Sequence, residues 1–222
     1  MKFHHAYKGI KILSHEQLIS TAIAFLCFME AIIETAGTSH PIKTAINTIV
    51  AVALLLGVIG LFLQIIGMYK ASKDEKLFLD SFYIIIIAFV TELIGTIAEK
   101  LLGVSSLEIF TLRTISDITS VIVICITIQG LSRIALKLDD HSIISRGISG
   151  SWTIPTLYIL AIATEAVPII LIATNTMEIA AIDTLSIISA IMVVLIDLYY
   201  YLYLENALKM LEASNQSSTG IE

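Results

Sequence analysis

Residues 44–68 read TAINTIVAVALLLGVIGLFLQIIGM, a run of 25 positions without a charged side chain. A helix needs about 20 mostly apolar residues to cross the hydrocarbon layer of a bilayer, so this run is long enough for one crossing. A transmembrane β-strand would instead show about 10 residues of alternating polarity, and the apolar run here is continuous. The stretch therefore predicts a membrane-spanning α-helix.

Five further apolar runs of similar length flank this one, separated by short polar segments. The predicted spans are 18–37, 44–68, 77–99, 112–134, 152–174 and 179–204, and the longest polar link covers residues 139–150. Span one is expected to be retained rather than cleaved as a signal peptide, because Glu30 and Glu34 interrupt its apolar run. The predicted organisation is a cytoplasmic or interfacial segment (1–17), one six-helix transmembrane domain (18–211) and a flexible cytoplasmic tail (212–222).

Composition excludes several classes of protein. The chain has 222 residues, of which 57% are hydrophobic and 14% charged, against about 25% charged in an average soluble domain. The net charge is −6 and the basic residues are dispersed, so no nucleic-acid partner is expected. Cys27 and Cys125 lie in apolar segments and are interpreted as small buried side chains rather than a disulfide or metal site. No catalytic motif or metal-ligand cluster is present, so the sequence predicts neither an enzyme nor a cofactor.

The distribution of basic residues predicts the orientation. Ten of the 13 Lys and Arg residues lie in the N-terminal segment, the 70–76 loop, the 133–151 link and the tail. The other side carries only Lys43, Lys100 and Arg113. Cytoplasmic loops carry an excess of Lys and Arg, so we expect a multi-pass protein of the cell membrane with both termini in the cytoplasm.

The spans also resemble one another in pairs. The hairpins 18–69, 77–138 and 152–211 each carry a Glu 13 to 16 residues into their first span, namely Glu30, Glu92 and Glu165. Their second spans carry Asn47, Asp117 and Asp183 near the start, and Gln64, Gln129 and Asp197 near the cytoplasmic third. Recurrence of this kind predicts three tandem helical hairpins with a pseudo-threefold internal repeat.

Acidic residues inside the spans are the candidate site. Ionisable side chains within a membrane usually face the interior of the helix bundle. Few basic residues lie in the spans, and such carboxylates either take up protons or bind a cation. The predicted site is an outward-facing acidic cavity for a cation or small cationic solute, formed by Glu30, Glu92, Glu165, Glu34, Asp117 and Asp183. The alternative is that each Glu lies close to the outer interface and bonds to a Ser, Thr or backbone carbonyl.

Two further features have structural interpretations. His4, His5 and His15, with the apolar residues between them, predict a short interfacial helix rather than a metal site. Gly57 and Gly60 are expected to allow close contact between helices.

Three segments carry a resemblance to known proteins. They are residues 7–11 (YKGIK), 66–75 (IGMYKASKDE) and 199–211 (YYYLYLENALKML). With them the chain resembles a group of small bacterial six-span membrane proteins. The resemblance covers most of the chain and implies a fold type but no activity and no site residues.

Two functions follow from these observations. The first is a small transporter, channel-like or solute-binding protein whose acidic cavity handles a cation or a proton-coupled solute. The alternative is a non-catalytic scaffold or accessory subunit that docks to a partner membrane protein through faces such as Gly57 and Gly60. By analogy of fold alone, the second resembles the substrate-binding membrane subunit of a vitamin importer.

Overall fold

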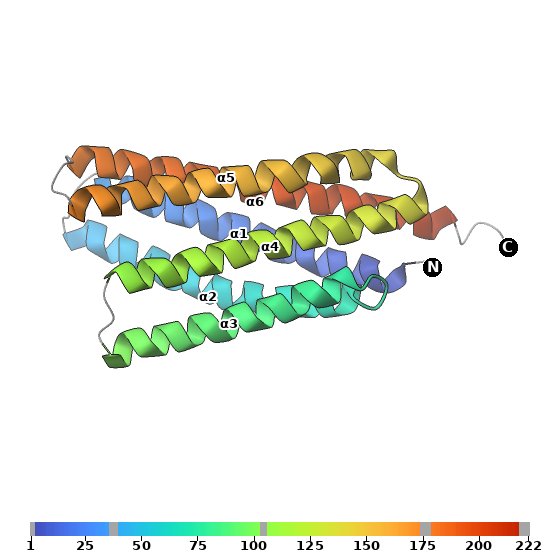
Figure 1. The fold of residues 1–222 in the computed structure, drawn as a ribbon, viewed down its shortest axis with the longest axis horizontal. Coiled ribbons are helices and arrows are strands. Elements are labelled where there is room, and N and C mark those ends of the chain that lie inside the picture. Colours follow the sequence, from blue (N-terminus) through green and yellow to red (C-terminus); the bar gives the residue numbers. More distant parts are fainter. Residues whose placement is uncertain (1–2, 36–39, 103–105, 174–178, 218–222) are drawn as a thin grey trace. The chain divides into compact units, whose positions relative to one another are not determined.

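The described part of the chain is entirely helical apart from short turns. The computed structural model describes residues 3–35, 40–102, 106–173 and 179–217, with side chains at 3–33, 44, 46–91, 93–94, 114–164, 166–167, 184–185 and 187–216. Six helices cover these residues, and no strand occurs among them (Figure 1). They are α1 (His4–Thr35), α2 (His40–Ala71), α3 (Leu77–Leu102), α4 (Ser106–Leu138), α5 (His141–Ala173) and α6 (Ile179–Ser217). The predicted all-α class is confirmed.

Four of the helices are long and apolar enough to cross a membrane over their described residues. These segments are His4–Ile33, Ile46–Ala71, Thr114–Leu138 and Ile187–Gln216. A shorter apolar segment, Leu77–Thr91, lies in α3. The lipid bilayer is therefore a fitting environment for the chain, while six crossings and the internal repeat remain predictions.

The helices are longer than the predicted spans. They contain 26 to 39 residues, which at 1.5 Å per residue corresponds to about 39 to 58 Å, against about 30 Å for a hydrocarbon core. Most of the predicted 139–150 link is helical, because α5 begins at His141. The residues around the predicted N-terminal and C-terminal boundaries are also helical, since α1 is unbroken from His4 and α6 continues to Ser217.

Two residues make the short turn between α4 and α5. Asp139 has a φ of 60°, a left-handed conformation that ends α4. The Asp140 carboxylate accepts the backbone N–H groups of Ser142 (3.0 Å) and Ile143 (3.2 Å). These bonds satisfy donors that have no partner within the first turn of a helix. Asp139 and Asp140 therefore end α4 and begin α5 within two residues. The polar stretch that the sequence predicted as a loop is instead a tight helical hairpin.

The chain divides into two compact units. Unit 1 contains Met1–Leu13, Ile65–Trp152 and Tyr203–Glu222, and unit 2 contains Ser14–Gln64 and Thr153–Leu202. In unit 1, α3 packs along α4, and the first turns of α1 and the last turns of α6 lie at the same end (Figure 1). Of the largest fully buried side chains, all but Ile154 and Ile196 belong to unit 1.

The core of unit 1 includes the start of α1. Phe3, Ala6, Ile10 and Leu13 recur at helical spacing and are buried. This stretch packs its apolar side chains against protein and is continuous with the rest of α1. The hydroxyl of Tyr7 donates a 2.9 Å hydrogen bond to Glu212 of α6, which links the first and last helices.

One glycine permits a very close contact in the same unit. A Cβ on Gly9 would lie 2.6 Å from both the Ala71 nitrogen and the Gly67 carbonyl oxygen. Both of these are backbone atoms, so a side chain at position 9 would force the helices apart. Gly9 therefore lets the backbones of α1 and α2 touch, as small residues commonly do between membrane helices.

Unit 2 presents many apolar side chains on its surface. Large apolar side chains are exposed along α2 between Val50 and Phe62, where Leu54 is 68% exposed and Leu55 65%. Exposed apolar residues also occur in its parts of α1, α5 and α6, among them Phe25, Ile159 and Leu195. Such surfaces are unusual on water-soluble proteins and fit contact with lipid.

Candidate functional site

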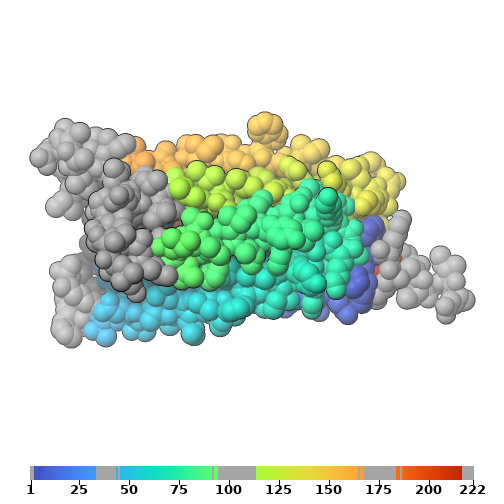
Figure 2. Space-filling view, turned by 60° about the horizontal axis from the view of Figure 1, so that its bottom comes forward, coloured from blue at the N-terminus to red at the C-terminus, as the bar shows by residue number. Residues whose placement is uncertain are grey.

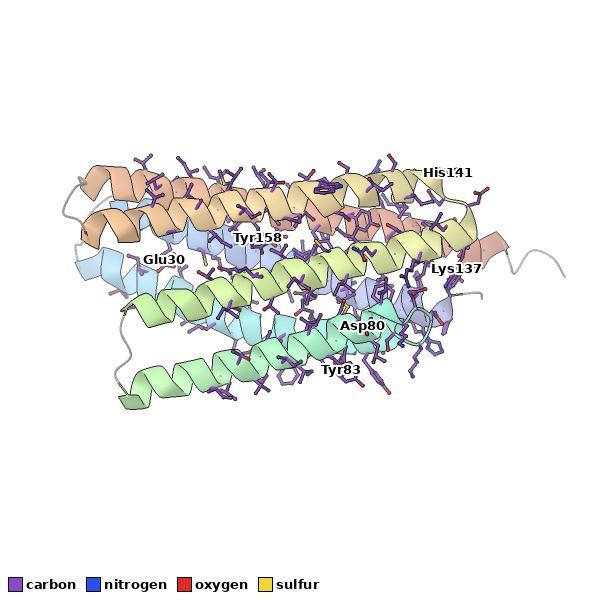
Figure 3. All side chains as sticks on the ribbon, in the orientation of Figure 1. Glu30, Asp80, Tyr83, Lys137, His141 and Tyr158 are labelled. Carbon is purple, nitrogen blue, oxygen red and sulfur yellow. The ribbon has the colours of Figure 1, made fainter. Side chains whose placement is uncertain are left out.

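The structure describes part of the predicted acidic site. The side chain of Glu30 is partly buried on α1 in unit 2 (Figure 3), and that of Asp117 is partly buried on α4 in unit 1. Glu34, Glu92, Glu165 and Asp183 belong to α1, α3, α5 and α6, but their side chains lie outside the described residues. The shared outer cavity therefore stays a prediction. In the described part of the chain, no three His, Cys, Asp or Glu side chains are grouped so that they would hold a metal ion.

A different group of polar side chains is buried inside unit 2. Glu16 and Gln17 of α1 are only 6% and 4% exposed. The Gln17 Nε2 group donates to Asp197 of α6, at 3.0 Å to Oδ1 and 3.3 Å to the backbone oxygen. Because one amide contacts both the side chain and the backbone of Asp197, it holds this carboxyl against α1. We call Glu16, Gln17, Ser20 and Asp197 the carboxyl cluster.

Glu16 is held from its own helix. The hydroxyl of Ser20, one turn later, donates a 3.0 Å hydrogen bond to Glu16 Oε1. The same carboxylate oxygen lies 4.0 Å from the position of a Cβ on Gly60, which is itself buried on α2. The backbone of α2 at Gly60 therefore lies near the carboxyl of Glu16, at a distance that would also admit a Cβ. Three helices therefore contribute to the surroundings of this acid.

The charge balance of the carboxyl cluster is its most informative property. Among the described residues, Glu16 and Asp197 form no ion pair with Lys, Arg or His. The two carboxyls are near enough to repel each other when both are ionised. An unpaired carboxylate is costly in an apolar interior, so the stable states are the neutral acid or a complex with a cation.

The other buried carboxylate, in unit 1, has the opposite arrangement. Glu75 is 7% exposed and contacts Lys137 at 2.8 Å and Arg133 at 3.5 Å. Lys137 lies at the end of α4 (Figure 3), and its ammonium also lies 5.9 Å from the centre of the Phe3 ring. Two cations thus satisfy Glu75, which identifies it as a structural link between the α2–α3 turn and α4 rather than a vacant site.

Of the four residues in the carboxyl cluster, the sequence analysis named only Asp197, as a recurring polar position of the last span and not as a site residue. Asp197 stands out as an acid within an apolar run, whereas Glu16 and Gln17 precede the predicted start of span one and read as residues outside the membrane. A signal for Glu16 existed. It stands three residues after Leu13, on the buried stripe that begins at Phe3 and Ala6, so a helix that starts earlier carries it inward.

Comparisons with protein-family models, curated proteins and solved structures find no match for this chain. The resemblance to small bacterial six-span proteins is therefore untested.

Proposed function

We propose that this chain is a six-span membrane protein with cytoplasmic termini that binds and moves a proton or a small cation through the carboxyl cluster. The orientation is supported by the bias of Lys and Arg toward one side of the predicted spans. The membrane setting is supported by the four helices that are long and apolar enough to cross a bilayer. Helices of this kind satisfy their own backbone hydrogen bonds in lipid.

The observation that carries the proposal is the burial of Glu16 beside Asp197 without a basic partner among the described residues. A carboxyl in this setting gains stability whenever it takes up a proton or a cation, and loses it on release. Gln17 and Ser20 donate hydrogen bonds that fix the two carboxyls, so binding requires little rearrangement of side chains. Intramembrane acids of this kind mark proton relays and ion pathways in transporters.

The predicted outer acids extend this proposal. Glu30, Glu92 and Glu165, together with Glu34, Asp117 and Asp183, would provide a second set of carboxyls on the other side of the membrane. A carrier that exposes its site alternately to the two sides needs an entry for the cation at each of them. We therefore propose that the outer acids collect the cation or cationic solute and that the carboxyl cluster receives it nearer the cytoplasm.

Binding is tested first, because it does not require the transported solute to be known. Infrared difference spectra of the reconstituted protein, recorded while pH or Na⁺ is changed, should contain a carboxyl band that the double substitution Glu16→Gln and Asp197→Asn removes. Both amides preserve the size of the side chain and keep an oxygen for Ser20 and Gln17. Asp80→Asn is the matched control, because Asp80 is an exposed acid on α3.

Transport is measured next in proteoliposomes that contain a pH-sensitive dye and carry an imposed membrane potential. Flux should fall to the level of empty liposomes in Glu16→Gln and be retained in Asp80→Asn. A carboxyl band that survives the double substitution would contradict cation binding at the cluster. A band that is lost without any change in flux would restrict the proposal to binding.

A second candidate function is supported by Gly57. A Cβ at this position would meet nothing within 4 Å, and its neighbours Leu54, Leu55 and Val58 are well exposed. This face of α2 can receive a helix of another membrane protein, as the scaffold hypothesis requires. The test is purification in a mild detergent. A stoichiometric partner that is lost in Gly57→Leu but retained in Ile159→Ala, at an exposed residue of α5, would favour the scaffold, and a solitary monodisperse chain would exclude it.

A further inference from the structure

The turn between α2 and α3 separates its charges. Residues 70–76 read Lys-Ala-Ser-Lys-Asp-Glu-Lys and carry three lysines and two acids. Both acids have partners within the protein: Asp74 accepts the backbone N–H of Ala6 at 2.7 Å, and Glu75 is buried against Lys137 and Arg133. Lys73 and Lys76 are exposed and Lys70 is partly exposed. A turn with a formal charge of only +1 thus presents mainly ammonium groups to its surroundings.

Aromatic side chains lie directly beside these lysines. The ring of Tyr69, at the end of α2, lies tilted against that of Phe82 with 5.9 Å between centroids, and the Phe82 ring contacts Tyr83 edge-on at 5.5 Å. Tyr69 and Tyr83 are 52% and 56% exposed, and Lys73 Nζ lies 5.4 Å from the centre of the Tyr69 ring. Tyr83 points outward from α3 (Figure 3). We call Tyr69, Phe82 and Tyr83 the aromatic face.

The aromatic face continues into an apolar surface. Ile66 precedes Tyr69 by one turn of α2 and Ile87 follows Tyr83 by one turn of α3, and they are 44% and 65% exposed. In the described part of the chain, α3 runs along the surface shown in Figure 2 without another helix over it. The order along the surface is therefore ammonium groups, aromatic rings and aliphatic side chains. This is also the order of headgroup, interface and acyl chain in a phospholipid layer.

We propose that this surface is a binding site for an anionic phospholipid, whose phosphate and headgroup lie against Lys73 and Lys76. Charge complementarity selects an anionic lipid, because the acids of the turn are already bound within the protein. The neighbouring apolar strip selects a lipid over a soluble phosphate, since a free ion would gain nothing from Ile66 and Ile87. Asp80, an exposed acid one turn after Lys76, reduces the attraction there, so Lys73 contributes more than Lys76.

The chain offers a clean optical test, because it contains a single tryptophan, Trp152, which is 77% exposed. Trp152→Phe removes the native fluorophore, and Tyr83→Trp places the single tryptophan on the aromatic face. Both substitutions are made at exposed positions. The full-length protein is reconstituted in mixtures of brominated phosphatidylglycerol or brominated phosphatidylcholine with their unbrominated forms. The quenching then gives the relative affinity of this surface for the anionic and the zwitterionic lipid.

The expected preference is for phosphatidylglycerol, by about fivefold for each lysine that contacts the headgroup. Lys73→Gln should remove most of the preference, whereas Lys73→Arg should keep it and raised salt should weaken it. Lys209→Gln, at an exposed lysine on α6, should leave it unchanged. Equal quenching by the two lipids, or the same loss in Lys209→Gln as in Lys73→Gln, would overturn the proposal.

Discussion

Gln17 is the residue on which the carboxyl cluster depends. The residue is 4% exposed, and its amide donates to both the side chain and the backbone of Asp197. Glutamine suits this role because its NH₂ group carries two donors, whereas a carboxylate carries none. The geometry of Asp197 is therefore set by a neutral side chain rather than by a counter-ion, which leaves the charge of the carboxyl free to change on binding.

We expect Gln17→Leu to destabilise the folded protein by about 1 kcal/mol, because Asp197 loses its donor while the volume of the side chain is kept. The same substitution should weaken the response of the carboxyl band to pH or Na⁺. Denaturation in detergent micelles, followed by circular dichroism, measures the first effect. Gln129→Leu is the control, since Gln129 is exposed on α4. If the two variants are equally stable, the amide does not hold the cluster.

At the scale of elements, the contact between α1 and α2 is set by backbone atoms. Gly9 meets the backbone at Gly67 and Ala71, and Gly67 in turn faces Leu13, whose Cγ would lie 2.7 Å from a Cβ at position 67. Close contact of this kind supplies dispersion energy in a membrane, where lipid removes the hydrophobic driving force between helices. By contrast, Gly57 lies in the same helix α2 with open space around it.

We predict opposite outcomes for alanine at these two glycines. Gly9→Ala forces α1 and α2 apart and should lower stability by about 1 to 3 kcal/mol, the usual cost of overpacking. Gly57→Ala should be neutral or stabilising by up to about 1 kcal/mol, because alanine favours the helix and meets no neighbour. Thermal unfolding in detergent compares the pair. A Gly9→Ala protein as stable as wild type would mean that α1 and α2 do not make this contact.

The ends of the elements were the part of the fold that the sequence predicted least well. An apolar run marks where a chain can face lipid, but it does not mark where the helix begins or stops. The 139–150 segment is polar and yet helical from His141, because Asp139 takes a left-handed conformation and Asp140 caps the next helix. In the same way, the buried stripe at Phe3, Ala6, Ile10 and Leu13 extends α1 well before the apolar run that begins at residue 18.

At the scale of the whole molecule, the proposed topology makes a prediction that does not depend on any site. In a protein without Cys27 and Cys125, a single cysteine at Ser72 in the α2–α3 turn should react with a membrane-impermeant maleimide only after the cells are opened. A cysteine at Ser39, between the first two predicted spans, should react in intact cells, because a single crossing separates it from the cytoplasmic N-terminus. Equal labelling of both positions in intact cells would contradict the six-span orientation.

The sequence by itself determined that this chain is an all-helical protein suited to a bilayer, because continuous apolar runs of 20 residues or more have few other stable environments. It also placed Asp197 among the recurring polar positions of the predicted repeat. Tertiary structure alone decided which acids are paired. Glu75 and Glu16 are both buried glutamates, but one receives Lys137 and Arg133 while the other lies beside Asp197. The reason is physical: helical periodicity specifies the face on which a side chain lies, whereas its neighbours come from helices far away in the chain, as Gln17 and Asp197 do across 180 residues.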